Sequence, residues 1–310
     1  MPRMHRYRMM NKRVKQSEKK RNIFQIIWSI ITNGYMIGFL RGTIYQGKLK
    51  SACVPGLNCY SCMGALGSCP IGSLQAELGL RPGKFPFYMF GFFMITGTLF
   101  GRLVCGFMCP FGLLQDLLHK VPKIPKIRKI KGERYLVKIK YLILVIFVIG
   151  LPLWLGLKQG LGDPAFCKFI CPQGTLEGGI PHVISNPLLR KVTGVLFNWK
   201  LAILITIVIL SMIIYRPFCK YICPLGAIYS FFNSISVYKY SIDRDKCIEC
   251  GACEKACMMN VNPLKNMDST ECIRCGRCKA ACPVNAIESS FSLISAKGYQ
   301  KRPDEKGKEI

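Results

Sequence analysis

The sequence predicts an α-helical integral membrane domain of four transmembrane helices, arranged as two repeated halves with a pseudo-twofold relation, followed by a small cysteine-rich α+β domain. Three observations predict this fold. The apolar residues gather in blocks, the basic residues alternate between the segments that join those blocks, and a Cys-Pro-x-Gly string recurs four times before the cysteine-rich region. We therefore divide the chain into a basic N-terminal segment (1–22), a membrane domain (23–239), a C-terminal domain (240–290) and a charged, flexible tail (291–310).

Four apolar blocks supply the predicted transmembrane helices. A helix that spans a bilayer needs about 17–25 mainly apolar residues, and aromatic residues such as Trp28, Trp154 and Trp199 flank the blocks as they do at membrane interfaces. No small-residue cleavage site follows the first block, so we expect an uncleaved anchor helix there. The blocks are residues 23–40, which is the weakest, 85–104, 141–157 and 201–215.

The basic residues predict the orientation of these helices. The net charge is +28, and nine Lys/Arg lie in residues 1–21 and nine in 120–140, against five in 41–84 and five in 156–200. This alternation is typical of basic loops that stay in the cytoplasm, and it argues against nucleic-acid binding as the reason for the charge. We expect a multi-pass protein of the plasma or inner membrane, with both termini and the C-terminal domain in the cytoplasm and basic segments against lipid headgroups.

Two C-x2-C-x2-C-x3-C runs near the end of the chain predict two [4Fe-4S] clusters. In such runs three cysteines bind one cluster and the fourth binds the other. Gly251 and Gly276 leave room for the loop backbone beside inorganic sulfide. Met258 stands where proline usually follows the first run. The expected ligand sets are Cys247, Cys250, Cys253 and Cys282 for the first cluster, and Cys272, Cys275, Cys278 and Cys257 for the second.

The four repeated strings begin at Cys69, Cys109, Cys171 and Cys223. Proline suits the first turn of a helix and pushes the residue before it out of the helical region. Each cysteine should therefore lie at a break between a membrane helix and a following helix. A helix N-terminus also favours an anionic ligand such as a thiolate-bound cluster.

The repeat predicts one cluster at the cytoplasmic side of the membrane domain. Cys105 and Cys109 follow the second apolar block, and Cys219 and Cys223 follow the fourth, each pair with i, i+4 spacing. A pseudo-twofold axis along the membrane normal brings the two pairs together. We expect these four cysteines to bind a third [4Fe-4S] cluster.

The outer side offers six cysteines for a fourth cluster. Cys167 and Cys171 repeat the CxxxCP pattern, but Ala65 stands where the first half should have its paired cysteine. By repeat position we choose Cys62, Cys69, Cys167 and Cys171 as ligands. Cys53 and Cys59 remain as alternative outer ligands or as a disulfide in an oxidising compartment, and structural disulfides throughout this region are a further alternative.

Other cofactors have less support in the sequence. The only histidines, His5, His119 and His182, lie outside the predicted membrane helices, so we expect no haem. No S/T-G-A-T motif for covalent flavin attachment is present. A quinone stays an alternative, because Asp116 and His119 at the inner interface could handle its protons; the other interpretation is an ordinary polar interfacial face.

With its CxxxCP motifs and the two C-terminal runs, the chain resembles the membrane-bound polyferredoxins related to NapH, which is the quinol dehydrogenase subunit of periplasmic nitrate reduction. It also resembles the iron–sulfur half of NosR-type proteins. The resemblance covers roughly residues 23–290. The C-terminal domain resembles bacterial two-[4Fe-4S] ferredoxins. These resemblances imply a one-electron relay rather than a stand-alone catalyst.

The expected partners are a cytoplasmic ferredoxin or reductase and a membrane or extracytoplasmic redox partner, such as a flavoprotein or reductase. This chain also has the cysteine-rich loop 53–69 and an outer CxxxCP motif, which the minimal two-motif pattern of those proteins does not need. Two alternative functions stay open: a quinol dehydrogenase subunit, and a maturation or regulatory factor that reduces a metal or thiol partner during assembly of another enzyme.

Overall fold

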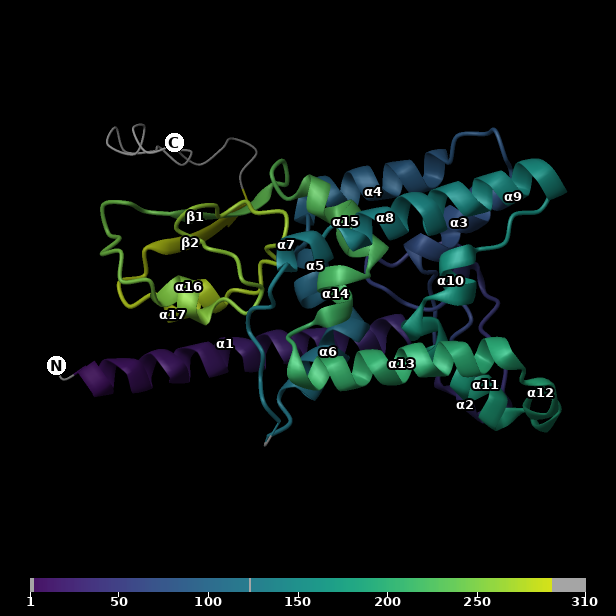
Figure 1. Ribbon diagram of the computed structural model, residues 1–310, viewed down its shortest axis with the longest axis horizontal. Coiled ribbons are helices and arrows are strands. Elements are labelled where there is room, and N and C mark those ends of the chain that lie inside the picture. The colour runs from purple at the N-terminus through teal and green to yellow at the C-terminus, as the bar shows by residue number, and fades with distance from the viewer. Residues whose placement is uncertain (1–2, 123, 292–310) are drawn as a thin grey trace.

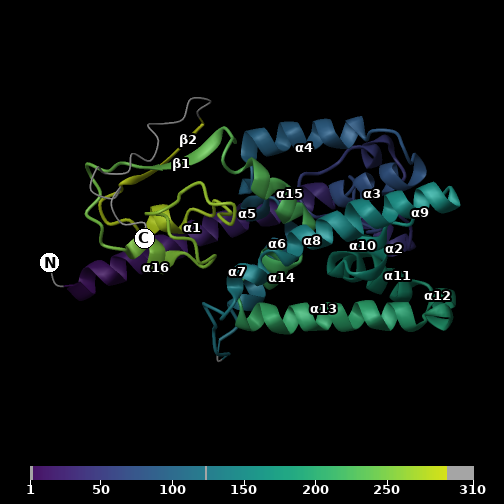
Figure 2. The same ribbon diagram turned by 45° about the horizontal axis from the view of Figure 1, so that its top comes forward.

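The computed structural model describes residues 3–122 and 124–291, in which long helical segments run along the longest axis and a small domain lies at one end (Figure 1). In a second view, α4 lies at the top, α9 in the middle and α13 at the bottom of the molecule (Figure 2). This arrangement confirms a mainly helical chain. The long segments are α1 (Arg3–Thr32), α4 (Phe87–Phe100), the continuous run of α8 (Ile139–Ile143), η2 (Leu144–Gly150) and α9 (Leu151–Gln159), and α13 (Val195–Ile213).

Short helices begin at the Cys-Pro strings, as the sequence predicts. Three of the cysteines have an extended backbone as the N-cap of a helix whose first turn holds the proline: Cys69 before α3 (Pro70–Leu80), Cys109 before α6 (Pro110–His119) and Cys223 before α15 (Pro224–Phe232). The fourth string leads into η3 (Gly174–Gly179) and α11 (Ile180–Ser185). The helices before the strings are α5 (Leu103–Phe107), α10 (Ala165–Phe169) and α14 (Pro217–Tyr221).

The first apolar block does not form the predicted helix 23–40. Instead, α1 begins at Arg3, because most residues of the basic segment before the block are good helix formers such as Arg, Lys, Met and Gln. It ends at Thr32, whose hydroxyl donates to the Trp28 carbonyl (2.9 Å), and the Asn33 amide group donates to the Ser29 carbonyl (3.1 Å). The helix α2 (Met36–Arg41) follows after a break. The domain boundary drawn at residue 22 thus falls inside a continuous helix.

The second apolar block is also shorter as a helix than predicted, because α4 ends at Phe100. Gly101 follows with φ 53°, a conformation that favours glycine. Among the described residues, two helical segments are long and apolar enough to cross a membrane, residues 133–159, which include α7 (Glu133–Leu136), and 195–213. The 14 residues of α4 fall short of that length. Four transmembrane helices therefore stay a prediction.

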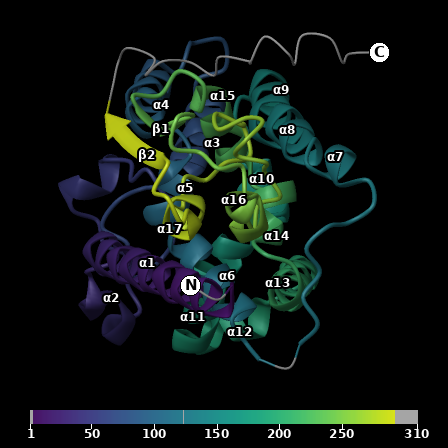
Figure 3. The same cartoon turned by 90° about the vertical axis from the view of Figure 1, so that its left-hand side faces the viewer.

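The C-terminal domain is α+β, as expected. Its strands β1 (Tyr238–Ile242) and β2 (Ile287–Phe291) pair antiparallel, with Tyr238 opposite Phe291. Its helices are α16 (Ala252–Ala256) and α17 (Arg277–Ala281). Viewed from this end, α1 passes beside α17 (Figure 3), and Arg277 forms an ion pair with Glu18 of α1 (2.5 Å). Apart from Phe291, the predicted tail lies outside the described residues.

The main core is built around cysteines. It contains Cys69, Cys105, Cys109, Cys171, Cys219 and Cys223 together with aromatic residues that include Phe111, Phe166, Phe218 and Tyr229. The end of the molecule opposite the C-terminal domain carries α2 and α12 (Pro187–Val192) (Figure 1), and η1 (Lys48–Ser51) lies in the loop that leads to Cys53. The cysteines expected to bind two clusters are thus part of the hydrophobic centre that holds the helices together.

Candidate iron–sulfur centres

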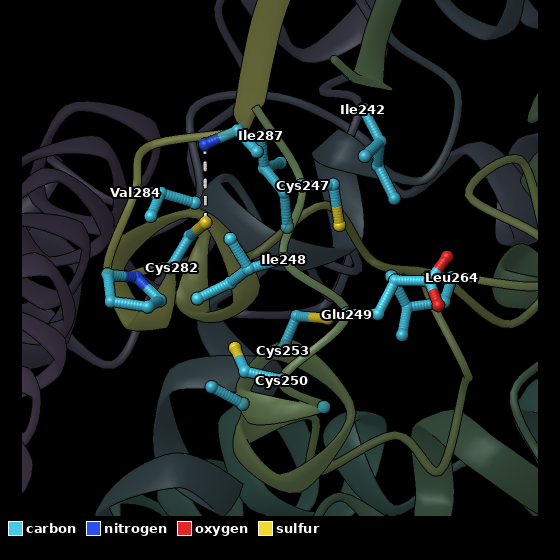
Figure 4. A pocket seen from close by; sticks show the side chains of 14 residues that line it. Ile242, Cys247, Ile248, Glu249, Cys250, Cys253, Leu264, Cys282, Val284 and Ile287 are labelled. Carbon is cyan, nitrogen blue, oxygen red and sulfur yellow. Dashed lines mark hydrogen bonds between the residues drawn. The ribbon is translucent and has the colours of Figure 1, made fainter. Parts of the chain in front are cut away.

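The first C-terminal ligand set, Cys247, Cys250, Cys253 and Cys282, surrounds one cavity (Figure 4). Cys253 lies on α16, and Cys282 is the residue that follows α17. The backbone amide of Ala286 donates a hydrogen bond to the sulfur of Cys282 (3.2 Å). The structure brings together the four thiols that the spacing assigns to the first cluster.

The second C-terminal set, which the sequence assigns to Cys257, Cys272, Cys275 and Cys278, also lines a single cavity. Burial raises the pKa of Cys272 to about 12. The two ligand loops have the same backbone shape, because Gly251 and Gly276 occupy equivalent positions with φ 67° and 79°. These left-handed conformations cost glycine nothing.

The inner set consists of Cys105 on α5, Cys109, Cys219 on α14 and Cys223. None of the four is more than 7% exposed. Burial, together with the nearby thiols of Cys219 and Cys105, raises the pKa of Cys109 to about 12. The pKa of Cys223 is raised by burial and by the same two neighbours. The structure thus brings the two CxxxCP pairs together, as the repeat predicts.

The outer set differs in one position from the sequence-based choice. One cavity is lined by four cysteines, and they include Cys59 in place of Cys62; the set is Cys59, Cys69, Cys167 and Cys171. A Cβ on Gly174 would lie 3.8 Å from the sulfurs of both Cys59 and Cys171. The sulfur of Cys62 instead lies 3.8 Å from the Asn33 side-chain oxygen. The two cysteines belong to one turn, in which the Cys62 amide donates to the Cys59 carbonyl (3.1 Å).

The inner and outer sets each have a glutamine at the same position of the repeat, and sequence-based reasoning missed both. Gln75 donates to the sulfur of Cys167 (3.3 Å), and Gln115 donates to the sulfur of Cys219 (3.2 Å). Each glutamine oxygen accepts from the amide of the phenylalanine before that cysteine, at 2.9 and 3.2 Å respectively. Both glutamines are fully buried. Each is the sixth residue after the cysteine of a Cys-Pro string, and this matching position was the available signal.

Backbone amides also make equivalent contacts in the outer and inner sets. Gly174 donates to the sulfur of Cys171 and Gly226 to the sulfur of Cys223, both at 3.4 Å. In each case the donor is the glycine of the Cys-Pro-x-Gly string, so the helix that follows the proline directs its first amides at the thiol. The two sites are therefore built from equivalent parts of the repeat.

The remaining outer cysteine, Cys53, lies beside its set. Its sulfur contacts the Ser73 hydroxyl (3.4 Å) and the Met89 sulfur (3.7 Å). All eighteen cysteines fall within the described residues and none is in a disulfide, so the alternative pairing of Cys53 with Cys59 is not formed. In the same residues no group of three or more His, Cys, Asp or Glu is arranged around a single metal ion.

The donor sets fit [4Fe-4S] clusters chemically. Each has four thiols, and burial together with repulsion from nearby thiols raises the pKa values of Cys109 in the inner set and Cys167 in the outer set, both to about 12. Metal binding requires thiolates and offsets this cost. Amide groups that donate to the sulfurs are the interactions that stabilise thiolate-bound clusters. When bound, such clusters supply one-electron redox chemistry.

The second C-terminal set lies directly against the inner set. A Cβ on Gly106 would stand 2.4 Å from the carbonyl oxygen of Ile273. Gly106 follows Cys105 in the inner set, and Ile273 follows Cys272 in the second set. The backbones that carry the two ligand sets are therefore in van der Waals contact.

A buried ion-pair cluster fixes this contact. The carboxylate of Glu271 bonds to Arg102 (2.9 Å) and Lys140 (2.6 Å), whose side chains are both fully buried. Arg102 also donates to the carbonyl of Cys219 in the inner set (3.4 Å). Because Glu271 immediately precedes Cys272, this cluster ties one ligand loop to the other.

Asp116 is neither a free carboxylate nor part of a solvated polar face. It is buried between Arg216 (2.5 Å) and Arg21 (2.7 Å). Burial acts to raise the pKa of Asp116, but the two guanidinium groups outweigh it and hold the pKa below its ordinary value. His119 packs edge-on against the Tyr215 ring, at 5.5 Å between centroids. The quinone-protonation role considered for Asp116 is thus disfavoured by its ion pairs.

Comparison with protein families matches parts of both the helical domain and the C-terminal domain. Two family models match, and both are described as a 4Fe-4S binding domain: one at residues 85–131, 141–186 and 199–242, the other at 240–257 and 266–288. The chain is a 4Fe-4S-binding protein of the polyferredoxin type. The matches cover three of the Cys-Pro strings and both C-terminal runs of this polyferredoxin, and the string at Cys69 lies outside them.

Curated relatives agree with this assignment. An uncharacterised protein of Methanocaldococcus jannaschii is 31% identical over 56% of this chain and 66% of its own length. The methylamine utilization ferredoxin-type protein MauN of Paracoccus denitrificans is 27% identical over 54% of this chain and 50% of its own. The putative electron transport protein YccM of Escherichia coli is 25% identical over 53% and 43%. The polyferredoxin thus spans 43–66% of the length of these three relatives. No solved structure matches significantly.

Proposed function

We propose that this polyferredoxin relays electrons between a cytoplasmic ferredoxin or reductase and a redox partner at the opposite face of the cell membrane. The observation that carries the proposal is the direct backbone contact between Gly106 of the inner set and Ile273 of the second C-terminal set. That contact links a ferredoxin-type domain to ligand sets within the helical domain. The names of two relatives, a ferredoxin-type protein and a putative electron transport protein, support the same general role.

The outward faces of the long helices support a membrane location with four spanning segments. Large apolar patches on a protein surface mark contact with lipid or a partner. All four segments expose such side chains: Ile27 and Ile30 on α1, Phe87 and Ile95 on α4, Val145 on η2 with Leu142 on α8, and Ile205 and Ile209 on α13. The alternation of basic loops supports a cytoplasmic location for the ferredoxin domain.

For the outer site we propose Cys59, Cys69, Cys167 and Cys171 as ligands, because these four line one cavity. With the inner set and the two C-terminal sets, the chain then holds four sets of four thiols. The loaded protein should contain about sixteen irons, at four for each cluster.

The proposal is tested with the full chain in sealed vesicles. Protein that is oriented with its ferredoxin domain outside should pass electrons from added reduced ferredoxin to ferricyanide trapped in the lumen. Cys219→Ala should abolish this transfer, since it removes a ligand of the inner set, and should leave both C-terminal signals in place. The proposal fails if the variant transfers as fast as the wild type, or if added quinol but not ferredoxin delivers electrons.

A further inference from the structure

The segment from Gly56 to Cys59 lies between the inner and outer ligand sets. A Cβ on Gly56 would stand 2.5 Å from the carbonyl oxygen of Met108 and 3.2 Å from the Cα of Cys109, so the segment is pressed against the inner site. Three residues later, Cys59 itself belongs to the outer cavity, whose lining also includes Leu57 and Asn58. One short stretch of chain thus contacts both sites.

The surroundings hold the stretch in place. Leu57 is 1% exposed and packs in the same core as Cys69 and Cys109. The hydroxyl of the buried Tyr229 donates to the carbonyl of Pro55 (3.0 Å). Asn58 is also 1% exposed, and within the described residues its side-chain nitrogen and oxygen have no hydrogen-bond partner. A fully buried, unpartnered amide at the outer cavity indicates a polar ligand beside it.

The geometry limits how far apart the two sites lie. Neighbouring Cα atoms in a chain are about 3.8 Å apart, so the Cα atoms of Cys59 and of Gly56, which packs against Cys109, lie within about 11 Å of each other. The hydrocarbon layer of a bilayer is about 30 Å thick. The inner and outer sets are therefore a close pair, rather than two sites at opposite membrane surfaces.

We propose that the segment from Gly56 to Cys59 is shared by the inner and outer ligand sets, and that it holds them close enough for one electron to pass directly between their clusters. The step oxidises one site and reduces the other, with no bond change, no proton transfer and no further cofactor between them. This inference rests on the proposed function, because it concerns clusters bound at the same sites.

The test is electron paramagnetic resonance of the fully reduced, iron-loaded chain. The signal of the outer site should be broadened by magnetic coupling to the inner site, and Cys219→Ser, which removes the inner site, should sharpen it. Cys250→Ser, in the first C-terminal set, is the control and should leave the broadening unchanged. An outer signal with the same width in the wild type and Cys219→Ser overturns the inference, and so does a protein whose outer set takes up no iron.

A second variant changes the shared segment without touching a ligand. Gly56→Ala introduces the Cβ that meets Met108 and should push the segment away from Cys109, which weakens the coupling at full iron content. Gly91→Ala is the matched control, because a Cβ there meets nothing within 4 Å. If the coupling persists but the protein cannot reduce ferricyanide in vesicles, the proposed function is contradicted and the close pair of sites is supported. If the protein transfers electrons in vesicles but shows no coupling, the close pair of sites is contradicted and the proposed function is supported.

Discussion

The carbonyl oxygen of Ile273 lies so close to Gly106 that a Cβ on the glycine would stand 2.4 Å from it. No side chain larger than hydrogen fits between the two backbones. Because Gly106 lies between Cys105 and Cys109, and Ile273 follows Cys272, this glycine sets how closely the ferredoxin domain approaches the inner site.

Replacing Gly106 with alanine should therefore separate the two ligand loops. We expect Gly106→Ala to keep all four sets of iron and to slow electron transfer from the ferredoxin domain to the inner site at least several-fold. Stopped-flow reduction of the inner site by reduced ferredoxin measures this rate. Gly91→Ala, on the open face of α4, is the control, and equal rates in the two variants would contradict the role of the contact.

The outer ligand set predicts different outcomes for neighbouring cysteines. Cys59→Ala should lose about four of the sixteen irons and the outer signal, because Cys59 lines the outer cavity. Cys62→Ala should keep both, since its sulfur faces Asn33. Iron analysis and low-temperature spectroscopy of anaerobically purified protein decide between them. Loss of iron in the Cys62 variant alone would restore the choice made from repeat position.

The two buried glutamines predict a matched pair of redox shifts. An N–H that donates to a ligand sulfur stabilises the reduced, more negative cluster. Gln115→Leu should therefore lower the reduction potential of the inner site alone, and Gln75→Leu that of the outer site alone. Each variant serves as the control for the other in a redox titration. A shift in both sites for either variant would contradict the separate assignment of the two glutamines.

The ion pairs of Asp116 predict a pH-dependent stability. Arg216 and Arg21 hold the pKa of Asp116 below its ordinary value against the effect of burial. A carboxylate with a lowered pKa stabilises the fold above its unfolded-state pKa, and this contribution is lost as the pH falls through the folded-state pKa. Asp116→Asn leaves two buried guanidinium groups without their carboxylate, which should cost about 3–5 kcal/mol at pH 7.

Thermal unfolding of wild type and Asp116→Asn in detergent measures this difference. The gap between the two proteins should be largest at neutral pH and should shrink below about pH 4, near the ordinary pKa of aspartate. Acid damage to clusters affects both proteins and cancels in the comparison. A gap that is constant with pH would mean that the carboxylate charge of Asp116 does not contribute.

Local chemistry made much of this structure predictable. Proline after Cys69, Cys109 and Cys223 fixes where helices begin, and the C-terminal spacing brings the right cysteines to each cavity. The ligands of the outer set were harder to predict from the sequence, because loop 53–69 has no helical periodicity that would order its thiols. Which of Cys59 and Cys62 faces the cavity depends on a single turn. Likewise, the sequence before Ile23 does not show whether this basic segment is flexible or forms a helix that a distant domain stabilises.

That helix has a consequence for biogenesis. Arg13 of α1 donates to the side chain of Asn285 (2.6 Å), and Glu18 pairs with Arg277 of α17 (2.5 Å), so two segments that lie far apart in the sequence pack on each other. Contacts between such distant positions form late in folding. The C-terminal domain must therefore be synthesised through α17 before α1 can pack against it. Until then Arg277, which lies beside the second C-terminal ligand set, lacks the carboxylate partner that Glu18 supplies in the folded chain.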